Sequence, residues 1–231
     1  MPNFDIIRES KAEKTFRVAS IMGKFDLQSD SIKERFTGSI DMPEDWQVGL
    51  IVGASGTGKT TIAKELFPDS YVTAFSYSRK TVTDDMPENK SVNEITKMFN
   101  SVGFSSPPSW LKSYSVLSNG EKMRADLAHS LLLDNSLIVF DEFTSVVDRN
   151  IAQIGSYAVQ KAVRKTSKKF IAVGCHYDIE EWLQPDWVFY TDSMTFKKKT
   201  IKKDRTLVLK SSESVHKIKQ SIGECLLSIT I

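Results

Sequence analysis

The stretch VGLIVGASGTGKTTIAKELF, residues 48–67, decides the fold of this chain. Its first part is a continuous apolar run, which is typical of a strand buried on both faces of a parallel sheet. Its last part, TTIAKELF, is a helical stretch. Between them, GASGTGKT satisfies the pattern G-x-x-x-x-G-K-[ST] in the strand-to-helix context that a phosphate loop requires. Because such a turn points its backbone amides inward, the sequence predicts a site for the phosphates of a nucleotide.

The loop also supplies the side chains that bind phosphate and its metal. Lys59 is expected to neutralise the outer phosphates, and Thr60 offers a hydroxyl ligand to Mg²⁺. Nucleotide binding alone does not fix the reaction, because kinases, GTPases and many ATPases share this loop. The candidate contacts to phosphate and metal are Gly53, Ser55, Gly56, Gly58, Lys59, Thr60 and Thr61.

Two further apolar runs, LIVFD at 137–141 and KFIAVGC at 169–175, predict parallel core strands. Helical periodicity follows Ser118 and again follows Asp148, so strands and helices alternate along the chain. This alternation implies right-handed crossovers in a three-layer α/β fold.

The flanking segments differ from this core pattern. The first 45 residues alternate more, as in KTFRVASI (14–21), and predict antiparallel strands beside the main sheet. Residues 84–117 predict a small helical insertion, with one short helix near 92–100 and a stop at Pro107-Pro108. Beyond residue 205, RTLVLK suggests a strand and Ser212 the start of a helix.

Polar side chains follow two of the predicted core strands. Asp141 and Glu142 end the second strand, where carboxyl ends of parallel strands line the ligand crevice. We expect Asp141 to hold Mg²⁺, and Glu142 to take a proton from an attacking water. His176 follows the third strand and could orient that water or bond a γ-phosphate. Lys59, Glu142 and His176 are thus the candidate catalytic residues, while a helix start at 141–142 and an ordinary surface or core histidine remain as alternatives.

The composition bounds the class of protein. A chain of 231 residues with 40% hydrophobic and 26% charged content is ordinary for one globular domain. A net charge of +2 argues neither for nor against a nucleic-acid partner. Cys175 and Cys225 form no disulfide framework and fit a reducing compartment. Since we see no secretory signal and no membrane span, a cytoplasmic protein is expected. The basic run KKKTIKKDR (197–205) reads as a solvated loop or as a nucleic-acid contact.

The phrase Ser118-Asn119-Gly120-Glu121 has two interpretations. It satisfies the pattern of a capping box, in which Ser118 and Glu121 bond each other's backbone amides at a helix start. The same helix N-terminus presents free amides and partial positive charge, which would stabilise a phosphate. The residues alone leave both open.

Five motifs stand in order along the chain: GASGTGKT, LSNGE, LIVFDE, SVVD (145–148) and His176. The spacing is 23 residues from Ser118 to Asp141 and 35 from Asp141 to His176. In this order and spacing they resemble the ABC-type ATPases. The resemblance implies an ATPase with ATP and Mg²⁺ as cofactors, in a P-loop NTPase fold of ABC type. The expected ATPase domain is 1–205, followed by an extension at 206–231.

The resemblance also implies a homodimer. In ABC-type ATPases two subunits meet head to tail, and the signature of one closes over the γ-phosphate held by the other. It therefore implies that Ser118 and Gly120 act on the partner's nucleotide, and that Asp148 communicates across the dimer. By the same resemblance Phe25 stacks on adenine, with Phe36 as the competing aromatic.

The chain departs from the family pattern in two respects. Residues 61–152 contain no glutamine, although ABC ATPases usually place one there to sense Mg²⁺ and water. Asp84 is the candidate substitute as a metal residue, Asp85 is nearly as good, and a solvated acidic turn is the alternative. The helical insertion is also small, so a transporter role is expected less than other roles.

A narrower resemblance concerns soluble ABC ATPases found with phage-like genes, some of which carry an acetyltransferase-like domain. Such a domain would not fit in the residues that follow, so no acetyl-transfer role is expected. Three functions are weighed: an ATP-closed homodimeric ATPase, an ATP-gated clamp on DNA or a protein, and the ATPase subunit of a transporter with a separate membrane partner.

Overall fold

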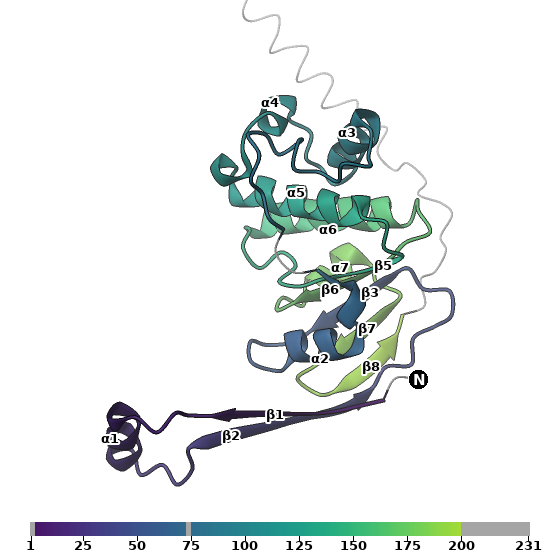
Figure 1. Ribbon diagram of the computed structural model, residues 1–231. Helices are drawn as coiled ribbons and strands as arrows, with labels where there is room; N and C mark the ends of the chain where they lie inside the picture. Colours follow the sequence, from purple (N-terminus) through teal and green to yellow (C-terminus); the bar gives the residue numbers. More distant parts are fainter. Residues whose placement is uncertain (1–2, 73–74, 200–231) are drawn as a thin grey trace, which may run out of the picture. The chain divides into compact units, whose positions relative to one another are not determined.

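A computed structural model describes residues 3–72 and 75–199 of the chain. Its core is a six-stranded sheet in the order β4-β5-β6-β3-β7-β8 (Figure 1). Strands β3 to β7 are mutually parallel, whereas β8 runs antiparallel to β7 at the edge. The strands are β3 (Val48–Val52), β4 (Tyr71–Val72), β5 (Leu137–Phe140), β6 (Lys169–Gly174), β7 (Trp187–Tyr190) and β8 (Thr195–Lys198).

Helices cover both faces of this sheet. The main ones are α2 (Lys59–Leu66), α5 (Asn119–Leu132) and α6 (Arg149–Val163), and a short α7 (Ile179–Leu183) follows β6. Alternate residues of β3 enter two separate clusters: Leu50 packs with Leu127 and Val159, whereas Ile51 packs with Ile62. All five are fully buried, and each such side chain stabilises the fold by about 1.5–3 kcal/mol. Helices α5 and α6 therefore cover one face and α2 the other, which confirms the predicted three-layer α/β fold (Figure 1).

The N-terminal strands β1 (Asn3–Lys11) and β2 (Ser31–Ser39) are antiparallel, as predicted, but this hairpin forms a two-stranded sheet of its own. The prediction for KTFRVASI was wrong, because this segment forms helix α1 (Phe16–Lys24) at the end of the hairpin (Figure 1). Thr15 caps the helix by accepting a hydrogen bond from the amide of Val18 at 3.2 Å. Val18 and Met22, four residues apart, are the half-buried side chains of α1, so the helical period decides this segment.

The helical insertion contains α3 (Val92–Ser101), α4 (Pro107–Trp110) and a short 3₁₀ turn at Tyr114–Val116. Another 3₁₀ turn, Pro68–Ser70, lies between α2 and β4. The predicted stop at Pro107-Pro108 was wrong, since the two prolines begin α4. Proline is tolerated in a first helical turn because its missing amide has no partner there anyway. Trp110 fixes the insertion by packing on Phe99 and donating its Nε1 hydrogen to the carbonyl of Phe104 at 2.8 Å.

Some predictions concern residues that the structure does not describe. The strand at RTLVLK, the helix from Ser212, the extension 206–231 and the stretch 200–205 of the basic run lie outside the described residues. Within the described residues, no helix combines the length and apolar character needed to cross a bilayer.

Candidate active site

The predicted phosphate loop joins β3 to α2. Gly58 precedes α2 with φ of 84°, a left-handed conformation that favours glycine, and no side chain caps the helix. The first amides of α2 are therefore free to bind an anion. Lys59 is only 9% exposed, and its ammonium donates to the carbonyl of Ala54 at 2.7 Å. This hydrogen bond holds Lys59 across the loop where it is expected to bind phosphate.

An aromatic ring from the N-terminal hairpin supports the loop. A Cβ atom at Gly58 would lie 2.5 Å from Cε1 of Phe36, so β2 approaches the loop too closely for any side chain there. Gly56 has a similar φ of 86°, but a Cβ there would meet nothing within 4 Å. Gly53 is buried, and its Cβ would lie 2.1 Å from Oγ1 of Thr191.

The loop opens onto a cavity of about 200 Å³. Its wall includes Phe36 and Glu142 together with Ser55, Gly56 and residues 58–61 of the loop. The hairpin contributes Arg8 to the same wall. The structure therefore brings most of the predicted phosphate contacts together with one predicted carboxylate, whereas Gly53 does not line the cavity.

Asp141 lies beside Thr60, as expected, although their strands are not neighbours. The phosphate loop follows β3 and Asp141 follows β5, and β6 lies between these two strands. Thr60 Oγ1 nevertheless donates to Asp141 Oδ2 at 2.7 Å, and the amide of Glu142 donates to Oδ1 at 2.8 Å. Tyr71, which the sequence argument missed, also donates its hydroxyl to Oδ2.

This donor set fits Mg²⁺ bound to a nucleotide. Mg²⁺ usually takes one or two protein oxygens and completes its shell with phosphate and water. A hydroxyl and a carboxylate in contact, next to a phosphate loop, meet that requirement. The described residues hold no group of three or more His, Cys, Asp or Glu side chains that would form an all-protein metal cage.

Glu142 has an exposed side chain and an unusual backbone. Its φ is 52°, which is rare for a residue with a Cβ and costs about 1–3 kcal/mol. The next residue, Phe143, is fully buried and its amide donates to the carbonyl of Val173 at 2.8 Å, which holds the segment in place. Glu142 also lines a second cavity of about 570 Å³ with Tyr71 and Asp141. Glu142 thus lines both cavities.

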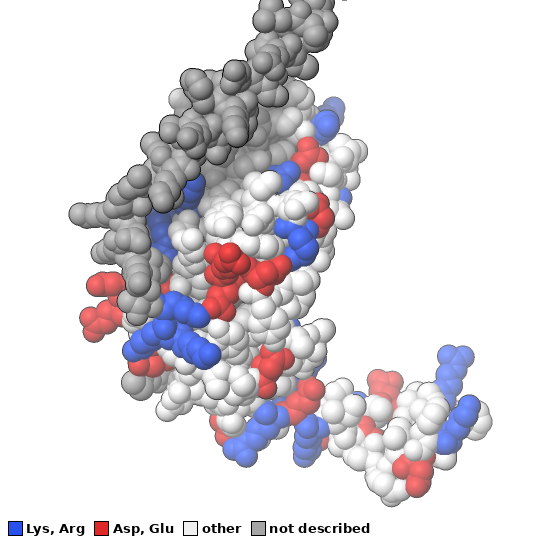
Figure 2. Space-filling model, turned by 180° about the vertical axis from the view of Figure 1, so that it is seen from behind, with Lys and Arg blue, Asp and Glu red and all other residues white. Residues whose placement is uncertain are grey.

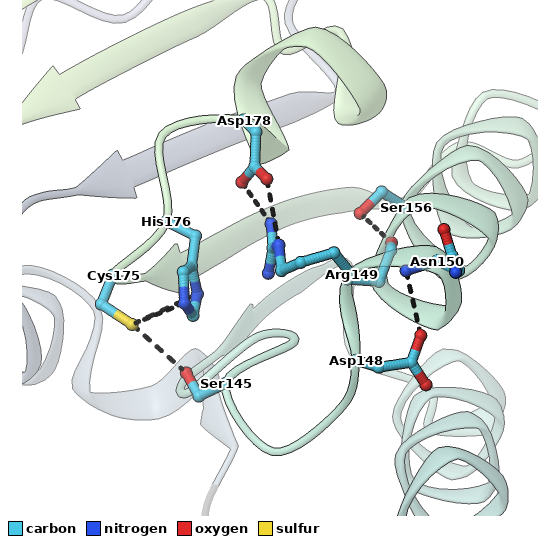
Figure 3. A network of polar contacts seen from close by, with 9 residues as sticks. Ser145, Asp148, Arg149, Asn150, Ser156, Cys175, His176 and Asp178 are labelled. Carbon is cyan, nitrogen blue, oxygen red and sulfur yellow. Dashed lines mark hydrogen bonds and ion pairs between the residues drawn. The ribbon is translucent and has the colours of Figure 1, made fainter.

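His176 follows β6 in a polar network (Figure 3). Its Nδ1 lies 3.3 Å from Sγ of Cys175, which in turn lies 3.9 Å from Oγ of Ser145. Arg149 Nε donates to Oδ2 of Asp178 at 3.0 Å, and this hydrogen bond holds the pKa of Asp178 below its ordinary value. The ion pair ties the start of α6 to the loop of His176. The histidine does not line the phosphate cavity.

Asp148 caps helix α6. Its Oδ1 accepts the amides of Asn150 and Ile151, each at 3.0 Å. Asp148 is exposed and directly precedes Arg149, the residue whose ion pair with Asp178 ties this segment to the loop of His176 (Figure 3).

The signature phrase forms a capping box. Ser118 Oγ accepts the amide of Glu121 at 3.3 Å, and Glu121 Oε2 accepts the amide of Ser118 at 2.9 Å. Hydrogen bonds from Ser109 and Ser118 lower the pKa of Glu121 to about 2. Ser118 is exposed, whereas Gly120 is buried, with its Cβ position 3.0 Å from Ile151 of α6. Neither Ser118 nor Gly120 lines the phosphate cavity of its own chain.

The remaining candidates lie apart from this cavity. Phe25 ends α1 at the far end of the hairpin and is 65% exposed, whereas the competing Phe36 contacts the loop. Asp84 accepts a hydrogen bond from Oγ1 of Thr81 at 2.6 Å. Asp85 accepts the amides of residues 78 and 79 at 3.0 Å. Both carboxylates thus stabilise their own turn, and neither lines a cavity with Asp141.

Comparisons with known proteins agree with this arrangement. A family model described as "ATPase family associated with various cellular activities (AAA)" matches residues 49–172, more than half of the chain. The energy-coupling factor transporter ATP-binding protein EcfA1 of Staphylococcus aureus is 26% identical over 208 residues, which cover 74% of this chain and 76% of that protein.

Solved structures show the same fold. The dimeric structure of MJ0796, a bacterial ABC transporter cassette, matches with a TM-score of 0.53 and 14% identity over 80% of this chain and 94% of its own. The cbiO1 protein of Clostridium perfringens, part of the ABC transporter complex cbiONQ, matches with a TM-score of 0.51 and 17% identity over 70% of this chain and 76% of its own.

Proposed function

Because this chain belongs to the ATPase family associated with various cellular activities (AAA) and has the fold of ABC transporter cassettes, we propose that it hydrolyses ATP with Mg²⁺ as a head-to-tail homodimer. The contact between Thr60 and Asp141, with Glu142 on the wall of the phosphate cavity, carries this proposal. It joins the residues that bind phosphate, metal and attacking water at one end of the sheet.

The loop binds the triphosphate. The ammonium of Lys59 turns from the carbonyl of Ala54 to the outer phosphate oxygens, and the free amides of α2 bind the β-phosphate. Thr60 and Asp141 hold Mg²⁺, which when bound neutralises charge that develops on the phosphate oxygens. Most of the catalysis by this chain is therefore positioning and charge stabilisation.

Two residues act on the attacking water. Glu142, exposed and fixed by its backbone, accepts the proton of the water. His176 acts on the γ-phosphate side of the site when the partner closes, and the ion pair between Arg149 and Asp178 holds the loop that carries it. Proton acceptance and water orientation are thus divided between the ends of β5 and β6.

The partner copy supplies the second wall. The N-terminus of α5 is capped by Ser118, which lies on the surface and does not line the phosphate cavity of its own chain. A helix of 14 residues presents a partial positive charge at this end, which suits the γ-phosphate of a second copy. Ser118 and the amide of Gly120 therefore act in trans, and the capping box gives the helix its fixed start.

The test is the variant Glu142→Gln. We expect ATP binding to persist, hydrolysis to fall about 10²- to 10⁴-fold, and an ATP-dependent dimer to accumulate. Phosphate release and size-exclusion chromatography with ATP measure these effects, and Lys59→Ala, which should lose nucleotide, is the control. A Glu142→Gln protein that stays monomeric at saturating ATP and turns over like the parent would refute both the base assignment and the composite site.

A transporter role stands beside the homodimeric ATPase. It is favoured by the relative EcfA1, which is named as a transporter ATP-binding protein. If this chain serves a transporter, affinity purification of the Glu142→Gln variant with ATP will recover a membrane protein from its host. Full turnover without lipid and no such companion would exclude this role.

A DNA clamp has less support from the described residues. On the face that Figure 2 shows, basic and acidic side chains lie interspersed. The lysines that open the basic run have intramolecular partners: Lys197 lies over the ring of Tyr190, and Lys198 pairs with Asp41 at 2.6 Å. Salt-sensitive retention on DNA that requires ATP would revive this alternative.

A further inference from the structure

Tyr71 contacts the proposed metal site from β4, at one edge of the sheet. Strand β4 pairs with β5 in parallel, with Tyr71 opposite Val139, two residues before Asp141. The register brings the Tyr71 hydroxyl to Oδ2 of Asp141, the same oxygen that accepts the hydroxyl of Thr60 at 2.7 Å. Both oxygens of this carboxylate are therefore held, since Oδ1 accepts the amide of Glu142 at 2.8 Å.

A lysine of the phosphate-loop helix fixes the ring of Tyr71. Lys64 lies one turn after Thr60 in α2, so the two side chains share one face of the helix. The ammonium of Lys64 stands 5.0 Å from the centre of the Tyr71 ring. Helix α2 thus reaches Asp141 twice, directly through Thr60 and indirectly through Lys64 and Tyr71.

The tyrosine also faces open space. It lines the cavity of about 570 Å³ together with Asp141 and Glu142, so its hydroxyl lies where the metal site meets that cavity. A group that orients a metal-binding carboxylate typically changes metal affinity or activity about 10- to 100-fold when it is removed.

From this geometry we propose that Tyr71 is a positioning residue of the active site: its hydroxyl orients Asp141 toward nucleotide-bound Mg²⁺, and Lys64 orients Tyr71. The inference rests on the proposed function. It adds a positioning residue that the sequence did not predict, whereas the carboxylate of Asp84, the predicted metal residue, accepts the hydroxyl of Thr81.

The test separates metal binding from nucleotide binding. Calorimetric titration with the non-hydrolysable analogue AMP-PNP, at a series of MgCl₂ concentrations and in EDTA, gives both affinities without turnover. For Tyr71→Phe we expect the half-saturating Mg²⁺ concentration to rise about 10-fold, with metal-free binding unchanged. Tyr77→Phe is the matched control, because it removes a hydroxyl that donates to Asp126 at 2.7 Å and should leave Mg²⁺ dependence as in the parent.

Two results would overturn the inference. They are an unchanged Mg²⁺ dependence in Tyr71→Phe, and a tighter one, which would mean that the hydroxyl competes with the metal. If Tyr71→Phe melts well below Tyr77→Phe, Lys64→Met is the second variant, with a smaller shift expected in the same direction and none if the inference is wrong. A parent without Mg²⁺-dependent binding would overturn the proposed function as well, whereas a failure confined to Tyr71→Phe refutes this inference alone.

Discussion

Replacing Gly58 with alanine should destabilise the fold more than the same change at Gly56. Both glycines have positive φ, 84° and 86°, which costs an alanine about 1–2 kcal/mol. Only at Gly58 would the new Cβ meet a ring, 2.5 Å from Cε1 of Phe36. Phe36 is 8% exposed and packed in the core, so overpacking adds about 1–3 kcal/mol. We therefore expect a loss of about 2–5 kcal/mol for Gly58→Ala and about 1–2 kcal/mol for Gly56→Ala.

Urea and thermal unfolding without nucleotide measure the two losses. At this chain length each kcal/mol lowers the melting temperature by about 2–4 °C, so the two variants separate clearly. The double variant Gly58→Ala with Phe36→Leu frees the contact and should recover part of the excess loss, because residues in contact are coupled. Equal losses at Gly56 and Gly58, or no coupling with Phe36, would refute the inference that the ring of Phe36 excludes a side chain at Gly58.

Two further predictions concern α5. Ser118→Ala removes the cap and should lower the free energy of unfolding by about 1 kcal/mol, whereas Ser118→Gly should lower it by a few tenths of a kcal/mol. Thermal melts measure both losses. ATP turnover should also fall in these variants, while the affinity of the monomer for ATP stays the same. Burial lowers the pKa of His129, which is stacked on Phe75, below its ordinary value of 6.5. Its contribution to stability is therefore present above pH 6.5 and is lost as pH falls through the lower pKa of the folded protein. As pH falls over that range, the parent should lose unfolding free energy relative to His129→Phe in urea titrations. A constant difference between the two proteins would refute this.

The layers of the fold could be predicted because the apolar runs and the helical periodicity in the sequence are pronounced. The run at 48–52 and the periodic stretches after Ser118 and Asp148 each carry several buried residues in one pattern. Helix α1 was wrongly predicted as a strand because a stretch as short as KTFRVASI fits both periods. The cap at Thr15 and the helical spacing of Val18 and Met22 together favour the helix.

The site was predictable where a local motif encodes it. The phosphate-loop motif and the Asp141-Glu142 pair predict that Thr60 and Asp141 lie close together. They do not predict that β6 lies between the strands that carry them. Tyr71 was missed because no motif marks it, and its contact with Asp141 depends on the pairing of β4 with β5. The position of Phe36 under Gly58 was missed because it depends on tertiary packing between segments that no pattern links.

The left-handed backbone of Glu142 has a consequence for how the protein could lose its activity. Glycine adopts that conformation without penalty, so a mutation to glycine would delete the carboxylate while relieving strain. In the proposed homodimer, such a folded but inactive chain would pair with active copies. If the chain acts as the proposed homodimer, a change of Glu142 to glycine would lower activity through mixed dimers rather than through loss of folded protein.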